Sequence, residues 1–283
     1  MMKTPLSIDL KGKVAVVTGA AGVLCSMFAE ALAANGASVA LLDLNGEKAK
    51  EVAAKICAEG GKAIGIETNV LQKESIEAAR EEVLKAFGKC DILLNGAGGN
   101  NPRGTTDKEY LFPEDVDNEE IKTFFNLDPK GVEFVFNLNF LGTLLPTQVF
   151  AKDMIERNSI IVNVSSMNAF CPLTKIPAYS GAKAAISNFT QWLAVHFSKV
   201  GIRVNAIAPG FFVTNQNRAL LLKEDGSYTD RSKKILSQTP MDRFGEAEEL
   251  LGTLLWLCDN GASGFVNGVV VPVDGGFAAY SGV

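Results

Sequence analysis

The sequence predicts an α/β fold in which about seven parallel strands form one doubly wound sheet between two layers of helices. Short apolar runs of the β type recur along the chain and alternate with longer helical patterns. This alternation is the order that a parallel sheet with crossover helices requires. Several of the runs end in small or polar residues, and in an open α/β sheet the carboxyl ends of the strands form the edge where ligands bind.

The first unit predicts a nucleotide-binding turn. An apolar strand over 13–18 runs into the turn GAAGVLC, a helical pattern that Gly36 can end, and a second strand over 37–43. Phosphates bind at such a helix N-terminus, where N–H groups are unpaired. Asp43 lies 24 positions after Gly19, close to the spacing of the acidic residue that binds a ribose diol. A carboxylate there predicts NAD(H) over NADP(H); the alternative interpretation is an ordinary strand-to-helix turn.

Two further units follow, with helices predicted over 45–59 and 73–87 and strands over 62–70 and 90–95. The last of these strands ends in Asn95-Gly96-Ala97-Gly98-Gly99, small residues that allow a ligand to approach the backbone. The polar segment 100–131 then breaks the pattern, and we expect a partly ordered flap over the site. An apolar helix over 134–154 carries Asn139 and Gly142.

The second half repeats the alternation. We expect a strand over 159–166, a helix from about Tyr179 to 199, a strand over 202–210, an irregular segment over 215–245, a helix over 246–258 and a strand over 268–276. The core side of the Tyr179 helix is predicted to be Ile186, Phe189, Trp192, Leu193 and Phe197. No linker or repeat divides the chain. We therefore predict a single domain, 1–283, with insertions near 100–131 and 215–245.

The residues that indicate chemistry lie between Ser165 and Lys183. Tyr179 and Lys183 are four residues apart, so they share one face of a helix. A nearby ammonium favours the phenolate and lowers the pKa of a phenol, which can then exchange a proton with an alcohol or carbonyl oxygen. Ser166, thirteen positions before Tyr179, can hydrogen-bond the same oxygen. The alternative is an interfacial tyrosine beside a snorkelling lysine.

Composition excludes several functions. The net charge of −5 argues against nucleic acid as a partner. No apolar run approaches the length of a membrane span, and the start lacks the apolar core of a signal peptide. The five scattered cysteines are expected to be reduced thiols in a cytoplasmic protein, with no metal site. The single histidine, His196, lies within a helical pattern and is expected to be structural, which leaves no histidine for a Ser–His–Asp triad or a His-rich metal site.

The ordered set of motifs resembles the short-chain dehydrogenase/reductase family over nearly the whole chain. The motifs are Thr18-Gly19, Asp43, Asn95-Gly96-Ala97-Gly98, Asn139, Ser166, Tyr179 with Lys183, Pro209-Gly210 through Thr214, and Val273-Asp274-Gly275-Gly276. The resemblance implies a Rossmann-type sheet, an NAD(H) cofactor, a small-molecule substrate, no nucleic acid, no membrane and a homotetramer.

The resemblance also implies roles. Tyr179 would be the general acid/base, Lys183 would lower its pKa and hold the nicotinamide ribose, Ser166 would orient the substrate oxygen, and Asn139 would hold a water of a proton relay. The residues that would contact the cofactor are Gly19, Ala21, Gly22, Val23, Leu24, Asp43, Leu44, Asn69, Val70, Asn95, Gly96, Ala97, Gly98, Tyr179, Lys183, Pro209, Gly210, Phe212 and Thr214.

Four positions depart from the family's pattern. Val23 and Cys25 occupy the second and third glycine places of the usual turn TGxxxGxG. Gly96 stands where a second asparagine is usual, and Asn69 stands where an aspartate is common beside the adenine.

More narrowly, GVLC, NGAGGNNP and two enlarged loops resemble one branch of this family, the D-mannonate oxidoreductases, or fructuronate reductases. A sugar acid needs a cation for its carboxylate, for which arginine is best suited, and donors for its hydroxyls. The candidates for the carboxylate are Arg103, Lys175, Arg218 and Arg231. The candidates for the hydroxyls are Asn100, Asn101, Asn168, Asn215 and Gln216, and Cys171 is expected to line the same side.

Three hypotheses remain open. The first is an NAD(H)-dependent oxidoreductase of a sugar acid, with D-mannonate/D-fructuronate as the best guess. The second is another short-chain reductase, of the gluconate 5-dehydrogenase or 3-oxoacyl reductase kind. The third is a nucleotide-binding sensor or scaffold without catalysis, which degenerate glycines would fit and a complete Ser166–Tyr179–Lys183 set argues against.

Overall fold

The computed structural model describes residues 2–214 and 218–282, and its centre is a seven-stranded sheet in which all neighbouring strands are parallel. The strand order is β3-β2-β1-β4-β5-β6-β7, the doubly wound order that the sequence predicted. The strands are β1 Val14–Thr18, β2 Ser38–Asp43, β3 Lys62–Glu67, β4 Ile92–Asn95, β5 Ser159–Val164, β6 Ile202–Pro209 and β7 Val270–Val273.

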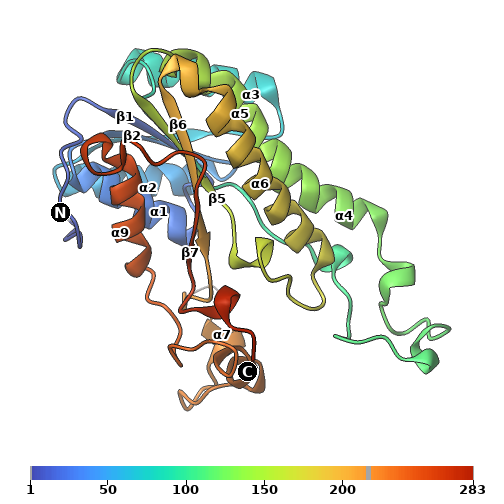
Figure 1. Cartoon of the computed structure of the whole chain (residues 1–283). Coiled ribbons are helices and arrows are strands. Elements are labelled where there is room, and N and C mark those ends of the chain that lie inside the picture. The colour runs from blue at the N-terminus through green and yellow to red at the C-terminus, as the bar shows by residue number, and fades with distance from the viewer. Residues whose placement is uncertain (1, 215–217, 283) are drawn as a thin grey trace.

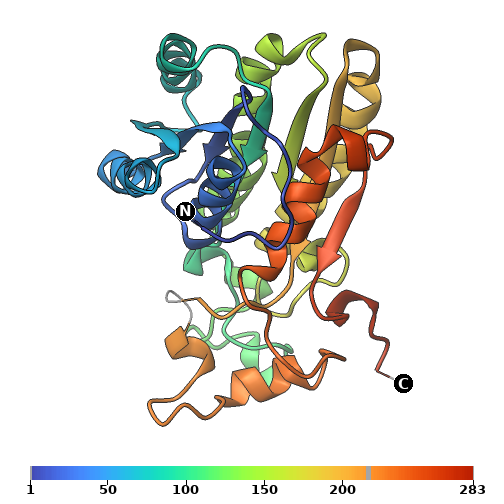
Figure 2. The same cartoon turned by 90° about the vertical axis from the view of Figure 1, so that its left-hand side faces the viewer.

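Helices cover both faces of this sheet and make three layers (Figures 1 and 2). One apolar cluster packs α1, α2 and α9 against one face, and a second packs α3, α5 and α6 against the other. Their bounds are α1 Val23–Ala34, α2 Gly46–Ala58, α3 Lys73–Ala86, α5 Gly142–Met154, α6 Pro177–His196 and α9 Glu249–Cys258. All residues of β1 and β4 are buried, because helices shield both sides of the central strands.

Several element boundaries differ from the prediction. Helix α1 begins directly after Gly22, earlier than its apolar pattern suggested, and β5 ends at Val164, two residues before Ser166. The predicted helix over 134–154 begins earlier, with α4 Pro129–Phe136, and contains a π-helical segment, Asn137–Leu141, before α5. Such segments have no signature in apolar periodicity, which is why the sequence did not reveal it.

The predicted core side of α6 was partly wrong. Ile186 and Leu193 are buried, but Trp192 is 56% exposed. Its ring stacks on His196 at a centroid distance of 4.5 Å, on the outer surface of the helix. The predicted set of apolar residues covers a wider arc of the helix than the side that faces the sheet. Trp192 lies outside that side and packs on its own helix instead.

The first insertion is partly ordered, as expected, but most of it extends away from the sheet (Figure 1). Three short 3₁₀ turns give it local structure: Pro102–Gly104, Pro113–Asp115 and Phe124–Asn126. The base of the insertion packs beside the start of α6: a Cβ built at Gly104 would lie 3.5 Å from the Ala178 Cβ. The buried Asp115 carboxylate pairs with Lys108 at 2.5 Å, which fixes the outer turn.

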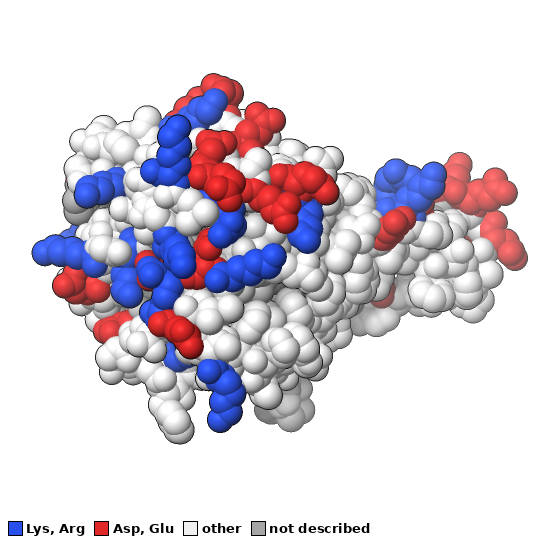
Figure 3. Space-filling model, turned by 90° about the horizontal axis from the view of Figure 1, so that it is seen from above, with Lys and Arg blue, Asp and Glu red and all other residues white. Residues whose placement is uncertain are grey.

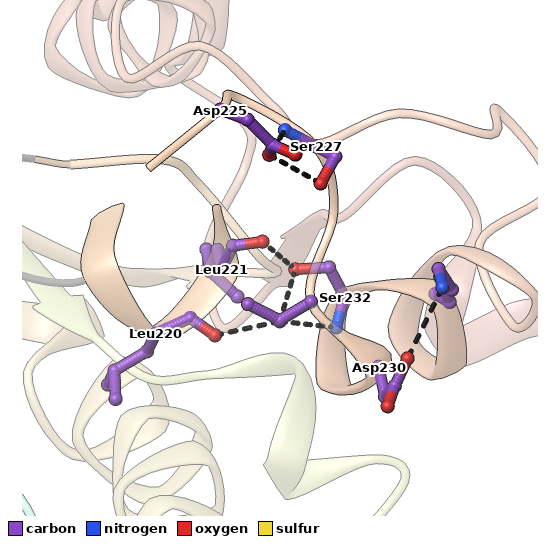
Figure 4. A network of polar contacts seen from close by, with 8 residues as sticks. Leu220, Leu221, Asp225, Ser227, Asp230 and Ser232 are labelled. Carbon is purple, nitrogen blue, oxygen red and sulfur yellow. Dashed lines mark hydrogen bonds and ion pairs between the residues drawn. The ribbon is translucent and has the colours of Figure 1, made fainter. Parts of the chain in front are cut away.

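The second insertion contains two short helices, α7 Arg218–Leu221 and α8 Asp230–Leu236, and Asn215 and Gln216 lie outside the described residues. Figure 4 shows how the two helices are tied together. The Thr229 hydroxyl donates to the Leu220 carbonyl at 3.0 Å, and the Ser232 hydroxyl donates to the Leu221 carbonyl at 2.5 Å. The segment predicted to be irregular therefore has a defined fold between Arg218 and Leu236.

One helical stretch, Pro129–Met154, is long and apolar enough to cross a membrane by length and composition alone. It contains no single uninterrupted apolar run of that length. Half of its apolar window is buried inside the protein, and the core helix of a soluble protein passes the same test.

The pair between Arg80 of α3 and Asp153 of α5 is expected to support the packing of these helices. Two bonds of 2.7 and 2.5 Å join the side chains, and Asp153 is buried. Arg80→Met leaves that carboxylate unpaired and is expected to lower the free energy of unfolding by about 3 kcal/mol. Urea unfolding measures this, with Glu81→Gln, which removes the exposed partner of Arg80, as the control. A cost for Arg80→Met no larger than the control's would contradict it.

Candidate active site

The carboxyl ends of five neighbouring strands bring the predicted residues to one edge of the sheet. In the register of the sheet, Thr18 is paired with Asn95, and Asn95 with Asn163. Both insertions extend from this edge (Figures 1 and 2). Residues that are far apart in the chain, from the glycine turn to the region after β6, therefore surround one site, as the sequence predicted.

Ser166 and Tyr179 lie next to each other, so that the Ser166 hydroxyl acts to lower the pKa of Tyr179. Ser166 follows β5 and accepts the Asn168 amide N–H at 3.3 Å, which holds the 3₁₀ turn Met167–Ala169. Tyr179 lies in the first turn of α6, which begins at Pro177 because proline is preorganised for that position. Two hydroxyl groups from different elements thus meet at the strand edge.

Lys183 is a buried cation one helical turn beyond Tyr179. Only 4% of its surface is exposed. Its Nζ donates to the Val164 carbonyl at 2.8 Å and lies 5.6 Å from the centroid of the Tyr179 ring. Burial lowers the pKa of Lys183 to about 8. The Ser165 hydroxyl, whose role the sequence did not suggest, donates to the Lys183 carbonyl at 3.1 Å and so supports this turn of α6.

The pKa of Tyr179 differs from the expectation. Burial raises the pKa of Tyr179, and the neighbouring Ser166 hydroxyl opposes this. The sequence predicted a lowered value through Lys183. The physical reason for the difference is that desolvation of the phenolate outweighs the other influences at this half-buried position.

Asn139 is fully buried in the π-helical segment and holds the turn that follows β4. Its Nδ2 donates to the carbonyls of Gly99 and Val135 at 2.7 and 2.8 Å, and its Oδ1 accepts the Gly99 N–H at 3.2 Å. A Cβ at Gly98 would lie 2.6 Å from this Oδ1 and 3.3 Å from the Lys183 Nζ. Asn139 and Lys183 therefore both lie against Gly98 of this turn. The predicted contact of Asn139 with a relay water stays a prediction.

The glycine turn has the shape that a dinucleotide requires. Gly19 has φ +65°, and a Cβ there would lie 2.8 Å from the Ala97 Cα. Gly22 caps α1 without a side-chain hydrogen bond, so the N–H groups of Val23 and Leu24 have no partner within the helix. No acidic residue lies in this first turn. An anion is favoured at such an end.

The adenosine side of the site is formed around Asp43. The two oxygens of its carboxylate accept the N–H groups of Ala21 and Asn45 at 3.0 and 2.9 Å. A carboxylate has about four acceptor sites, so a ribose diol can still bind. Leu44 beside it is 70% exposed, while Val70 is buried and Asn69 accepts the Leu71 N–H at 3.0 Å.

The far side of the site follows β6. Gly210 is needed there because a Cβ would lie 2.6 Å from the Asp274 Cα, and its N–H donates to the Val273 carbonyl at 2.9 Å. Phe212 forms an isolated bridge with Gly245, and the Thr214 carbonyl accepts the Arg218 N–H at 2.9 Å. Pro209 ends the strand.

The candidates for the substrate side differ in their surroundings. Arg103 is paired with Asp128, so its guanidinium already supports the first insertion. Asn100 donates to Thr105 at 3.2 Å. Lys175 and Arg218 are exposed, and Lys175 makes no ion pair with any described residue. Asn168 is buried, and its Oδ1 has no hydrogen-bond partner among the residues that the structure describes.

The two insertions meet through a contact that the sequence did not predict. Lys234 of α8 pairs with Glu109 at 2.6 Å, and the Thr106 N–H donates to the Lys175 carbonyl at 2.8 Å. Glu109 and Lys234 are 125 positions apart, and neither belongs to a motif. The pair places the first insertion beside the second at the edge where the candidate residues gather.

A family model of short chain dehydrogenases matches residues 13–225. The chain belongs to the short-chain dehydrogenase family. A crystal structure with bound NAD, of a protein from Haemophilus influenzae provisionally named a D-mannonate oxidoreductase, is 64% identical, has a TM-score of 0.93, and is matched over 97% of this chain and 98% of that one.

Two further relatives are similar over nearly their whole length. The Bacillus subtilis protein named "Uncharacterized oxidoreductase UxuB" is 52% identical over 280 residues, which cover 99% of each chain. The 3-oxoacyl-[acyl-carrier-protein] reductase FabG of Aquifex aeolicus is 37% identical over 273 residues, which cover 96% of this chain and 99% of the relative. The fold and the order of motifs are thus those of a short-chain dehydrogenase.

In this member of the family, the buried Lys183 is expected to make stability depend on pH. The folded protein holds the pKa of Lys183 near 8, below the ordinary value of 10.5, so the unfolded chain binds more protons between these values. Stability therefore rises as pH increases through this window, by about 3 kcal/mol at most, and the penalty is fully present below pH 8.

Urea unfolding of the cofactor-free protein at about pH 7.5 and 9.5 tests this against Lys183→Met, which lacks the titration. The wild type should gain stability relative to the variant as pH rises. Lys199→Met, at an exposed position, is the control. Parallel pH dependence in the wild type and Lys183→Met would show that the buried ammonium is not the cause.

Proposed function

We propose that this chain is an NAD(H)-dependent oxidoreductase that interconverts a secondary alcohol and a ketone on a sugar acid. The observation that carries the proposal is that Ser166 and Tyr179 lie next to each other, with the buried Lys183 one helical turn beyond Tyr179, at the carboxyl edge of the sheet. The 64% identical structure with bound NAD supports the choice of cofactor. The best candidate substrate pair is D-mannonate and D-fructuronate.

The residues of the edge fit a dinucleotide. Gly19 has no side chain that would block the approach of the cofactor. The first turn of α1 offers N–H groups to the diphosphate, and the Asp43 carboxylate offers acceptors to the ribose. A carboxylate at this place repels a 2′-phosphate, which favours NAD(H). The remaining contacts are assigned to the turn after β4 and to the segment from Pro209 to Thr214. The nicotinamide supplies the hydride chemistry when it is bound.

Tyr179 is assigned the proton transfer. In the direction of reduction, its hydroxyl donates a proton to the carbonyl oxygen of the substrate, and Ser166 orients that oxygen with a second hydrogen bond. In the direction of oxidation, the phenolate accepts the hydroxyl proton. A protonated Lys183 stabilises the phenolate because the two groups share one helix face. Asn139 fixes the turn that faces the Lys183 ammonium.

The polar surroundings support a sugar acid. Asn168 has a buried amide oxygen without a partner among the described residues, which suits a substrate hydroxyl. Lys175 and Arg218 are exposed cations near the same edge and suit the carboxylate, whereas Arg103 is held by Asp128. Asn100 lies at the start of the first insertion.

The second candidate is a reductase of acyl-carrier substrates, favoured by the 37% identical relative that is named as one. Such a substrate needs an apolar channel or a basic docking surface. Of the neighbouring cations, Lys233 and Lys234 are paired with Asp230 and Glu109, which weakens a docking surface there. A gluconate 5-dehydrogenase activity and a sensor without catalysis are separated from the first candidate by the substrate panel below.

We also propose that the chain is one domain, acts in the cytoplasm and assembles as a homotetramer. Exposed apolar side chains on α4 and α6, including Phe134, Phe136, Trp192 and Val195, support the assembly. Figure 3 shows a broad surface without charges between the charged main body and the first insertion.

The test of the function is NADH oxidation with D-fructuronate, 5-keto-D-gluconate and a 3-oxoacyl thioester. We expect the highest kcat/KM with D-fructuronate, and a lower kcat/KM with NADPH. The highest value with the thioester would favour the second candidate. NADH binding without turnover on any substrate would favour the sensor.

Tyr179→Phe is expected to lower kcat by a factor of about 10²–10⁴, because it removes the proton donor, while the affinity for NADH changes little. Steady-state kinetics and fluorescence titration measure the two quantities. Tyr228→Phe, at an exposed position in the second insertion, is the matched control. Undiminished turnover in Tyr179→Phe would refute the assigned role.

A further inference from the structure

The turn after β1 and the turn after β4 interlock at the edge of the sheet. The Thr18 hydroxyl accepts the N–H groups of Gly96 and Ala97 at 3.1 and 3.3 Å. A Cβ at Gly19 would lie within 3.0 Å of three backbone atoms of Gly96 and Ala97. The two turns are therefore in direct backbone contact.

Cys25 occupies the space beside this contact. It lies in the first helical turns of α1 and is 6% exposed. A Cβ at Gly96 would lie 2.2 Å from the Cys25 Sγ and 2.9 Å from the Thr18 carbonyl oxygen. The thiol thus fills the volume that any side chain at position 96 would need, and the absence of a side chain at Gly96 leaves room for the thiol.

The opposite side of the same turn is equally close to the candidate catalytic residues. A Cβ at Gly98 would lie 2.6 Å from the Asn139 Oδ1 and 3.3 Å from the Lys183 Nζ. The segment from Gly96 to Gly98 is therefore held between α1 on one side and Asn139 with Lys183 on the other. A shift of α1 against this segment would change the distance between the helix N-terminus and Lys183.

We propose that Cys25 and Gly96 are a matched pair, in which Cys25 is a positioning residue that sets the N-terminus of α1 against the turn after β4. By this contact the pair places the diphosphate end of the NAD(H) site relative to Lys183. The inference rests on the proposed function, because it concerns the cofactor site of that enzyme. It also gives a reason why a residue larger than glycine is present at position 25.

The thiol acts here as a packing group. Burial raises the pKa of Cys25 to about 12, so it is uncharged at neutral pH and is not a nucleophile. A buried neutral thiol behaves as a small apolar side chain. Its volume is therefore the property that matters, and variants at this position should follow size.

The test is a double-mutant cycle with Gly96→Ala, Cys25→Gly and the double variant. Gly96→Ala is expected to raise the NADH dissociation constant by about tenfold or more, since its methyl group overlaps the thiol. The double variant is expected to bind NADH at least about threefold more tightly than Gly96→Ala alone, because the glycine at position 25 removes the 2.2 Å overlap with the thiol and leaves only the 2.9 Å approach to the Thr18 carbonyl oxygen. Thermal unfolding of the cofactor-free proteins should show the same coupling. Gly252→Ala, with open space around it, is the control.

The inference would be overturned if Gly96→Ala bound NADH as tightly as the wild type. It would also be overturned if the dissociation constant of the double variant rose by the product of the two single-variant factors. If Gly96→Ala and the double variant both fail to fold, Cys25→Ser and Cys25→Leu carry the test. The serine variant should bind within about threefold of the wild type and the leucine variant about tenfold more weakly or worse. Equal affinities would overturn the inference.

The binding assay contains no substrate, so it separates this inference from the proposed reaction. At saturating NADH, kcat of Gly96→Ala is expected to fall by a smaller factor than its affinity for NADH. A loss of folded protein would give the opposite result, because it lowers the apparent kcat and leaves the affinity of the folded fraction unchanged. A wild type that binds no NADH would overturn the proposed function. Additive effects in an enzyme that binds NADH would overturn the matched pair alone.

Discussion

The burial of the Lys183 ammonium is the constraint on which the rest of the site depends. A buried cation is unfavourable unless polar groups surround it, and the structure gives it the Val164 carbonyl at the end of β5. This bond fixes α6 against the strand, and Tyr179 follows because it lies one turn earlier on the same face. Ser165 strengthens the arrangement through the Lys183 carbonyl, and Ser166 then meets Tyr179.

The cofactor edge obeys a second constraint, which is steric. Gly19, Gly96 and Gly98 each lie so close to a neighbouring element that a Cβ would overlap it. The helix α1, the turn after β4 and the π-helical segment with Asn139 therefore approach one another at glycines, where neighbouring backbone, the Cys25 thiol and the Asn139 amide occupy the space that a side chain would need. Such contacts allow the elements around the site little movement. Hydride transfer requires this, because its rate depends on the exact distance between the reacting atoms.

The sheet and the grouping of the candidate catalytic residues were predictable from sequence, because they depend on patterns and spacings within short stretches of the chain. The alternation of strand and helix patterns predicts the doubly wound parallel sheet, and the spacing of Ser166, Tyr179 and Lys183 predicts that these residues lie together. Long-range contacts were not predictable. The pair Glu109–Lys234 joins residues in two irregular insertions, Trp192 lies outside its expected core side, and the contact of Cys25 with Gly96 appears only when two turns meet.

The central claim is that hydride passes between NAD(H) and a carbinol carbon of a sugar acid in this site. The most direct test is a reaction of the enzyme with D-fructuronate and NADH that carries deuterium at C4 of the nicotinamide, followed by mass spectrometry and NMR of the product. The account predicts D-mannonate with one deuterium on the new carbinol carbon. A product without deuterium, or no product while NADH remains bound, would contradict it.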